Sequence, residues 1–256
     1  MSETQTRRVL VTGSSRGIGR ALALGLAQDG YELVVHCASN RAKAKETRKM
    51  IEEKGGKAAV VTGDLTDPCT AERLMAENGP LDALVLDASM QIRRPWQKIS
   101  LEEYQKQMTC NFYSSLRLIQ LAVPHMKAQK WGRIVTIGSV QERKPHPDML
   151  VYSASKAAQT NMAQSLAQQL AADGITVNNV APGVIFTDRN VEALSDPTYA
   201  AEVTASIPAG LEVTASIPAG FYGEPRDCAG VVRLLLSDAA RYITGQSIYV
   251  DGGKSL

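Results

Sequence analysis

VLVTGSSRGIG, residues 9–19, is the stretch that decides the fold. The apolar run Val9-Leu10-Val11 predicts a buried strand, and the residues from Gly17 onward predict a helix. The turn between them is rich in glycine, and the N-terminus of the helix offers N–H donors and a positive dipole end to phosphate groups. This order predicts a dinucleotide site made by Gly13, Ser14, Ser15, Arg16, Gly17, Ile18 and Gly19.

The three glycines of this turn have separate expected roles. Gly13 permits a tight turn, Gly17 lets the backbone approach a pyrophosphate, and Gly19 permits close packing of the helix on the strand. Their spacing, G-x-x-x-G-x-G, differs from the G-x-G-x-x-G of many dinucleotide enzymes. The strand before the turn and the helix after it therefore strengthen the prediction.

The rest of the chain continues the alternation of strand and helix. Short apolar runs and longer helical patterns indicate a parallel sheet that is covered on both faces. We expect an α/β fold, a Rossmann-type doubly wound parallel sheet of about seven strands with helices on both faces, in a single domain of residues 1–256. The strands are expected at 8–11, 33–36, 57–61, 83–86, 133–137, 176–180 and 247–250, and the helices at 17–29, 41–54, 66–77, 100–129, 149–172 and 226–236.

The composition argues against several classes of function. The chain has 28 Lys and Arg against 26 Asp and Glu, a formal charge of +2, with no basic block. This balance argues against a nucleic-acid or membrane partner, and no segment resembles a transmembrane helix or a signal peptide. Because the four cysteines and three histidines are scattered, we expect free thiols, no metal and a cytoplasmic protein. His36, His125 and His146 are expected on the surface or in loops.

The end of the second predicted strand bears on the choice of cofactor. NAD-binding proteins usually carry Asp or Glu there, which would repel a ribose 2′-phosphate. Here the residues are His36-Cys37-Ala38-Ser39-Asn40-Arg41, without an acid, and Arg16 lies in the glycine turn. Guanidinium and hydroxyl groups suit a phosphate, so NADP(H) is favoured over NAD(H), with contacts from Ser39, Asn40 and Arg41. In the alternative interpretation, Arg41 only begins a solvated helix.

Tyr152 and Lys156 are the candidate acid–base pair. Their i,i+4 spacing in a predicted helix places both side chains on one face. A free tyrosine has a pKa of about 10, and a neighbouring ammonium favours the phenolate and lowers that pKa. Ser139 ends a predicted strand at the sheet edge where ligands bind. Y-x-x-x-K alone also occurs by chance, but its combination with the glycine turn and this serine argues against coincidence.

Residues 12–19, Asn111, Ser139, Tyr152/Lys156 and Pro182-Gly183 together resemble the short-chain dehydrogenase/reductase family. The similarity spans essentially the whole chain, and residues 242–253 are similar to the subgroup of 3-oxoacyl-carrier-protein reductases and sugar or polyol dehydrogenases. The family is commonly homotetrameric, which implies a homotetramer here.

The resemblance also implies a role for each of these residues. Tyr152 would donate and accept the proton, Lys156 would lower its pKa and bind the nicotinamide ribose, and Ser139 would orient the substrate oxygen. Asn111 would support a water relay to Lys156. The further cofactor contacts that the resemblance implies are Asp64, Leu65, Asp87, Ala88, Pro182, Gly183, Ile185 and Thr187.

Two features depart from the family pattern. Leu86-Asp87-Ala88-Ser89 stands where the family usually has Asn-Asn-Ala-Gly, which adds a charge and a side chain beside the cofactor. Residues 202–211 (EVTASIPAGL) and 212–221 (EVTASIPAGF) form a tandem duplication that is identical at nine of ten positions. Two copies are too few for a solenoid. They lie in the expected substrate cover, about residues 184–225, where loops tolerate insertion.

These features predict an NADP(H)-dependent oxidoreductase that interconverts a carbonyl and a secondary alcohol. The loops expected around the site are polar, which suits a sugar, polyol or hydroxy/keto acid better than an acyl chain. Asp173 also stands near the position where carrier-protein reductases usually have a basic residue. Two alternatives stay open: a 3-oxoacyl-(acyl-carrier-protein) reductase, and a non-catalytic NADP-binding regulatory protein. The presence of Asn111, Ser139, Tyr152 and Lys156 argues against the second.

Overall fold

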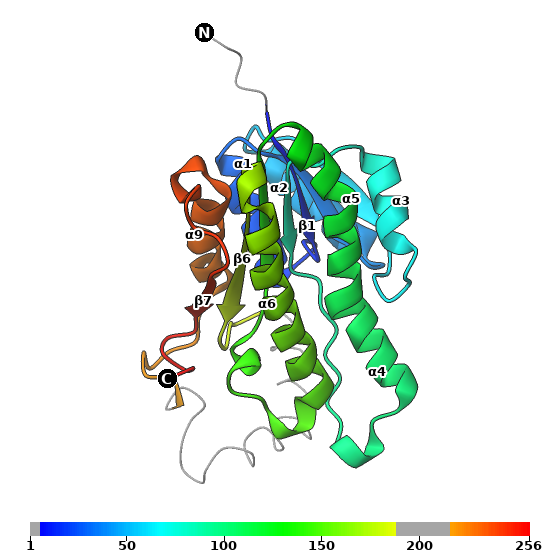
Figure 1. Cartoon of the computed structure of the whole chain (residues 1–256), viewed down its shortest axis with the longest axis vertical. Helices are drawn as coiled ribbons and strands as arrows, with labels where there is room; N and C mark the ends of the chain where they lie inside the picture. The colour runs from blue at the N-terminus through cyan, green and yellow to red at the C-terminus, as the bar shows by residue number, and fades with distance from the viewer. Residues whose placement is uncertain (1–5, 188–215) are drawn as a thin grey trace.

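The computed structural model describes residues 6–187 and 216–256 (Figure 1). Within these ranges, seven parallel strands form one sheet in the order β3-β2-β1-β4-β5-β6-β7. The strand order changes direction between β1 and β4. Ligands of open α/β sheets bind outside the carboxyl ends of the strands at such a point. The topology therefore places the glycine turn, which follows β1, at the expected ligand site.

The strands and helices alternate along the chain as predicted. The strands are β1 (Arg8–Thr12), β2 (Glu32–Cys37), β3 (Ala58–Thr62), β4 (Ala83–Leu86), β5 (Gly132–Ile137), β6 (Ile175–Pro182) and β7 (Ser247–Val250). The α-helices are α1 (Gly17–Gln28), α2 (Arg41–Glu52), α3 (Thr70–Asn78), α4 (Leu101–Met108), α5 (Ser114–Ala128), α6 (Leu150–Leu170) and α9 (Pro225–Leu236).

Helices cover both faces of the sheet, which confirms the predicted doubly wound architecture. α1, α2 and α9 lie over one face, on a core that includes Leu22, Val35 and Val232. α3, α5 and α6 lie over the other face, on a core that includes Leu84 and Leu118. Figure 1 shows α5 and α6 in front of the sheet. The arrows of β6 and β7 point toward the lower end of the molecule in this view. Among the helices of the described ranges, none combines the length and hydropathy needed to cross a membrane.

Two predicted helices differ from the structure in detail. The helix expected at 100–129 has both ends within one residue of the prediction, but a π-helical turn at Thr109–Tyr113 separates it into α4 and α5. Hydrophobic periodicity does not reveal such a turn, which is frequent at functional sites. The helix expected from residue 66 begins at Thr70, because Asp64 and Asp67 accept hydrogen bonds from the backbone two residues on and form turns there.

Candidate active site

The glycine turn after β1 has a backbone that glycine adopts most readily. Gly13 and Gly17 have φ angles of 72° and 57°, in the left-handed region. Gly19 has no room for a side chain, because a Cβ there would lie 2.6 Å from Gly13 O and 2.7 Å from Asp87 Oδ2. Open backbone at the N-terminus of α1 is the cradle expected for a pyrophosphate.

His36, at the end of β2, supports this turn from inside the protein. Its Nδ1 accepts a hydrogen bond from Gly13 N–H at 3.1 Å, and its Nε2 lies 2.9 Å from the carbonyl oxygen of Gly63. Because Nδ1 accepts, Nε2 must carry the proton, and the ring is neutral. Burial lowers the pKa of His36, in agreement with a neutral ring. The expectation of a surface or loop histidine was therefore wrong for His36, which is 1% exposed.

The other two histidines are less buried. His146 lies in the loop after β5, as expected. His125 lies on α5, and its Nε2 is 3.0 Å from Asp82 Oδ1. In the part of the chain that the structure describes, no group of three His, Cys, Asp or Glu side chains could hold a metal ion.

Ser14 and Arg20 also fix the glycine turn. Ser14 Oγ donates to Val11 O at 2.7 Å and accepts from His36 N–H at 3.0 Å. Arg20 Nε donates to Ser15 O and to Thr47 Oγ1, each at 3.0 Å, and so ties the turn to α2. Sequence reasoning missed His36 and Arg20, because their partners lie on other elements and are known only once these elements pack.

The predicted 2′-phosphate residues Ser39, Asn40 and Arg41 are exposed at the end of β2. Asn40 caps α2, since its side chain accepts from Lys43 N–H at 3.0 Å. Arg16 is half-buried and precedes α1, in the turn that His36 joins to β2. The segment contains no acid, so its charges fit a 2′-phosphate. On the loop after β3, which also meets β2, Asp64 is exposed and Leu65 is buried.

Asp87 and Ala88 follow β4 and lie against the glycine turn. Ala88 N–H donates to Thr12 Oγ1 at 3.0 Å, and a Cβ on Gly13 would lie 3.1 Å from Ala88 Cα. The Asp87 carboxylate lies close to Gly19 in the first turn of α1, where the helix dipole favours an anion. The charge that departs from the family pattern is thus placed at a helix N-terminus.

Tyr152 and Lys156 come together on the first turns of α6. Lys156 Nζ lies 5.8 Å from the centre of the Tyr152 ring. It donates to Ile137 O at 2.6 Å, at the end of β5, and Ser139 follows two residues later. Ser139 Oγ accepts from Gln141 N–H at 3.2 Å. The structure therefore gathers three of the four predicted catalytic residues, Ser139, Tyr152 and Lys156, at the carboxyl end of β5.

Lys156 is 1% exposed and is among the most deeply buried large side chains of the described residues. A buried ammonium is costly unless its charge is paired or hydrogen-bonded. Besides Ile137 O, its Nζ donates to Gln159 Oε1 at 3.3 Å. A charged group kept at this cost beside a tyrosine is typical of a functional site.

Asn111 lies in the π-helical turn and is completely buried. Its side-chain oxygen accepts from Met90 N–H at 2.7 Å, and its nitrogen donates to Met90 O and Ser155 Oγ, each at 2.9 Å. Ser155 Oγ in turn donates to Tyr152 O at 2.7 Å. The Asn111 side chain therefore joins the loop after β4 to the catalytic turn of α6, and its part in a water relay stays a prediction.

The segment after β6 returns to the glycine turn. Pro182 ends β6 beside Val250, and a Cβ on Gly183 would lie 2.7 Å from Asp251 Cα. Ile185 is buried and bridges Gly223. Thr187 follows, with a methyl group 3.6 Å from where a Cβ on Gly17 would lie. Thr187 therefore lies beside the glycine turn, and the contacts of Ile185 and Thr187 with a cofactor stay predictions.

The end of the second decapeptide packs on the C-terminal segment. Ile217 is 3% exposed and lies on Gly252, where a Cβ would be 2.8 Å from Ile217 Cγ2. Ala219 N–H donates to Gly252 O at 2.9 Å, and Lys254 Nζ donates to Ser216 Oγ at 2.7 Å. We call these contacts of residues 216–219 with residues 252–254 the C-terminal anchor. Residues 188–215, which include the whole first copy, lie outside the described residues.

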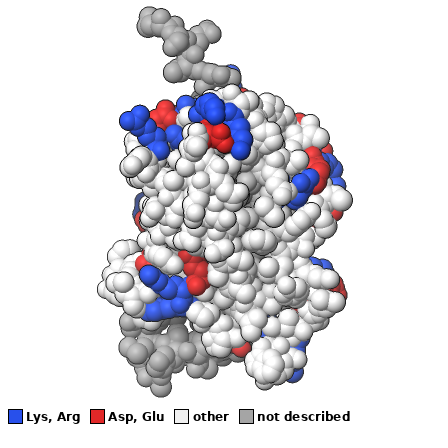
Figure 2. All heavy atoms as spheres, in the orientation of Figure 1, with Lys and Arg blue, Asp and Glu red and all other residues white. Residues whose placement is uncertain are grey.

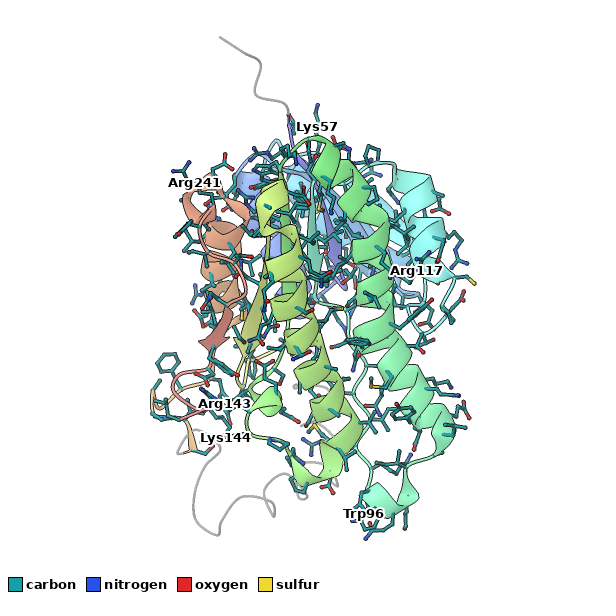
Figure 3. All side chains as sticks on the ribbon, in the orientation of Figure 1. Lys57, Trp96, Arg117, Arg143, Lys144 and Arg241 are labelled. Atoms are coloured by element: carbon teal, nitrogen blue, oxygen red, sulfur yellow. The ribbon has the colours of Figure 1, made fainter. Side chains whose placement is uncertain are left out.

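The loops at the carboxyl ends of the strands are polar. Figure 3 places Trp96, Arg143 and Lys144 toward the lower end of the molecule, and Lys57 and Arg241 toward the opposite end. Arg143 lies 5.0 Å from the centre of the Tyr249 ring, and Lys144 Nζ bonds Leu256 O. A pocket of about 400 Å³ lies between the loop after β5 and the start of α6, lined by Gln141, Glu142, Pro145, His146, Pro147, Leu150, Ser153, Ala154 and Ala157.

Asp173 forms ion pairs with two lysines near the end of α6. Lys127 Nζ and Lys130 Nζ lie 3.0 and 3.1 Å from its two oxygens. Their hydrogen bonds lower the pKa of Asp173, so the carboxylate stays charged. The carboxylate offsets one of the two positive charges, so this part of the surface offers less positive charge to an acidic carrier protein than the lysines alone would.

Comparison with known proteins places these features in one family. The model of the short chain dehydrogenase family matches residues 7–198. The chain is 34% identical over 255 residues to 3beta-hydroxysteroid dehydrogenase 1 of Eggerthella lenta, covering 98% of this chain and 94% of that protein.

Two solved structures are also similar, each with 34% identity and a TM-score of 0.85. One is a 3-oxoacyl (acyl-carrier-protein) reductase from Agrobacterium tumefaciens with NADP bound, covering 96% of this chain and 93% of that one. The other is a putative NAD(P)-dependent gluconate 5-dehydrogenase from Beutenbergia cavernae with bound NADP at low occupancy, covering 97% of this chain and 96% of that one.

Proposed function

Because the chain belongs to the short-chain dehydrogenase family and is an oxidoreductase, we propose that it uses NADP(H) to interconvert a carbonyl and a secondary alcohol on a small polar substrate. The substrate class is a sugar, a polyol or a hydroxy/keto acid. The observation that supports the proposal most is the buried Lys156 ammonium, 5.8 Å from the Tyr152 ring at the end of β5.

The proposed mechanism assigns the proton to Tyr152. When bound, the nicotinamide supplies or accepts the hydride. Tyr152 Oη gives a proton to the carbonyl oxygen during reduction and takes it back during alcohol oxidation. Lys156 stabilises the phenolate and binds the nicotinamide ribose, while Ser139 Oγ holds the substrate oxygen. The low exposure of Tyr152 and Lys156, 8% and 1%, keeps water from weakening this electrostatic stabilisation.

The substrate proposal rests on the charge and polarity of the surface near the site. The pocket beside α6 is lined by Gln141, Glu142, His146 and Ser153, which offer hydrogen bonds to hydroxyl groups. The similar gluconate 5-dehydrogenase points to the same substrate class. Activity on 3-oxoacyl thioesters is the second candidate, favoured by the similar carrier-protein reductase and opposed by the pairing of Asp173 with both lysines.

An NADPH-oxidation assay on keto acids, keto sugars and 3-oxoacyl thioesters tests the proposal, with NADPH binding measured in parallel. Turnover restricted to thioesters would favour the carrier-protein substrate. Binding without turnover on any substrate would indicate the non-catalytic regulatory protein.

We further propose a homotetramer in the cytoplasm, consistent with four free cysteines. The exposed residues of α6 carry no charge: Leu150, Ala154, Ala157, Asn161, Gln164, Ser165, Gln168 and Gln169. Figure 2 shows few charged side chains over the middle of the face on which α5 and α6 lie. Uncharged helical faces of this kind are suited to contact between subunits. Within each subunit we propose one domain of residues 1–256, with residues 184–225 as the substrate cover.

We expect the protein to prefer NADPH over NADH, and Arg16→Ala to reduce this preference about tenfold. A hydrogen bond to a charged group is worth about 1.5–3 kcal/mol, and the loss of about 1.4 kcal/mol is a tenfold change. The kcat/KM values for both cofactors give the ratio. Arg48→Ala, which removes an exposed guanidinium paired with Glu52 on α2, should keep the parent ratio. Equal efficiency of the parent with both cofactors would contradict the interpretation of β2.

Deleting residues 212–221 and changing Leu211 to Phe is expected to alter the substrate profile far more than the stability. The remaining copy has the same Ser-Ile-Pro-Ala-Gly-Phe sequence and can form the C-terminal anchor. Ten fewer loop residues change the loop-closure entropy only slightly, but a displaced cover can change the rate up to about 100-fold. Values of kcat/KM over the substrate panel, compared with the Tm, test this. Equal profiles would mean that the second copy is a passive bulge.

A further inference from the structure

A buried chain of hydrogen bonds runs from Lys156 into the protein interior. Lys156 Nζ donates to Gln159 Oε1 at 3.3 Å, and Gln159 Nε2 donates to Ser115 Oγ at 3.0 Å. Ser115 Oγ donates to the backbone oxygen of Asn111 at 3.4 Å. Gln159 and Asn111 are 0% exposed, Lys156 is 1% exposed and Ser115 is 3% exposed. We call these four groups the Gln159 chain.

The direction of this chain is fixed by the chemistry of its ends. An ammonium can only donate, so it requires the carbonyl oxygen of Gln159 rather than the NH2 group. The NH2 group then faces Ser115, whose hydroxyl accepts and in turn donates to a backbone carbonyl. Every link runs donor to acceptor away from Lys156. The chain therefore suits a positively charged lysine, because Gln159 presents to it an oxygen that accepts rather than an NH2 group that donates.

We propose that Gln159 is a positioning residue that holds the Lys156 ammonium beside Tyr152, with Ser115 fixing the Gln159 amide. This inference rests on the proposed function, in which Lys156 stabilises the Tyr152 phenolate. Ile137 O restrains Nζ from the strand side at 2.6 Å, and Gln159 Oε1 restrains it from within α6. Two fixed acceptors on different elements orient a long, flexible side chain more narrowly than one.

Few charges on the packed elements compete with this arrangement. β6 has no titratable side chain, and Arg133 of β5 is bonded to Gly132, Gly174 and Asp238 near the other end of the sheet. Glu142, before α6, accepts from Thr160, Asn179, Ser247 and Tyr249. On α4, Glu102 pairs with Lys106 and Glu103 pairs with Arg94. Tyr104 of α4 and Tyr113 of the π-helical turn are exposed, and Cys110 of that turn is buried. Near the start of α6, Asp148 is exposed and His146 is half-buried.

The test is Gln159→Met, which keeps the length of the side chain and removes the oxygen acceptor. For alcohol oxidation, which requires the phenolate, we expect kcat/KM at neutral pH to fall about tenfold. A less well-held ammonium stabilises the phenolate less, so the acidic limb of the pH profile should move about one unit to higher pH. The Kd of NADPH, measured by fluorescence, should rise several-fold because Lys156 is also expected to bind the ribose.

Three further variants separate positioning from a loss of packing. Ser115→Ala should move the acidic limb in the same direction by a smaller amount. The double variant should match Gln159→Met, because Ser115 acts on Lys156 only through Gln159. Met162→Ala, on the same helix and outside the chain, should lower the Tm while leaving the limb and the Kd unchanged.

The inference would be overturned if the acidic limb of the pH profile and the Kd of NADPH stayed at parent values in Gln159→Met. It would also be overturned if Met162→Ala shifted both quantities as much as Gln159→Met does. Retained turnover in Tyr152→Phe would instead overturn the tyrosine mechanism itself, and the positioning role with it. The two failures are therefore distinguishable.

Discussion

Tyr152→Phe is expected to lower kcat at least about 100-fold while leaving the Kd of NADPH nearly unchanged. The substitution removes only the hydroxyl that transfers the proton, and general acid–base catalysis contributes about 10²–10⁴-fold. The aromatic ring is kept, and the hydrogen bonds of Ser155 Oγ to Tyr152 O and of Lys156 Nζ to Ile137 O do not involve the hydroxyl. Steady-state kcat in both directions and a fluorescence titration with NADPH measure the two quantities.

Tyr242→Phe is the matched control, because this tyrosine is 98% exposed and lies near β7. Its kcat should equal that of the parent. Turnover that persists in Tyr152→Phe would show that another group transfers the proton, and the proposed mechanism would be wrong.

Lys156→Ala is expected to reduce both the rate and the affinity for NADPH, each by at least about tenfold. A hydrogen bond to a charged group is worth about 1.5–3 kcal/mol, and one ammonium is proposed to serve both the ribose and the phenolate. The variant also leaves Ile137 O and Gln159 Oε1 without their donor and opens a cavity, so we expect a lower Tm.

Lys156→Met separates the charge from the packing. Its side chain fills most of the space but cannot donate, so the Tm should recover further than the rate or the NADPH affinity. Lys98→Ala, which removes an exposed lysine, serves as the neutral control. A parent-like Kd for NADPH in both Lys156 variants would contradict the dual role.

The sequence was sufficient to predict the sheet and its covering helices, because apolar runs and helical periods are local signals. The glycine turn was also predictable from a local signal. Gly13 and Gly17 have a left-handed backbone conformation that few other residues adopt, so the glycines themselves mark the turn in the sequence. The π-helical turn at Thr109–Tyr113 was not predicted, because such turns are rare and the periodicity used to recognise helices assumes 3.6 residues per turn throughout.

The candidate site was predictable where one segment contains the whole motif. Tyr152 and Lys156 are four residues apart in one helix, and the structure brings them together as expected. His36, Arg20 and Gln159 were missed. Each forms a hydrogen bond with a residue 23 to 44 positions away along the chain: Gly13, Thr47 and Ser115, respectively. Long-range pairing of this kind appears only after the elements have packed.

The C-terminal anchor is formed by a sequence that occurs twice in the chain. The docked residues 216–219 belong to the second copy, and residues 206–209 repeat the same Ser-Ile-Pro-Ala. A substitution in the first copy therefore leaves the docked sequence intact, whereas the same substitution in the second copy meets Gly252 directly. The second copy is therefore under a steric constraint, because Ile217 and Pro218 must fit against Gly252 and Gly253, where even an added Cβ would lie within about 3.1 Å of them.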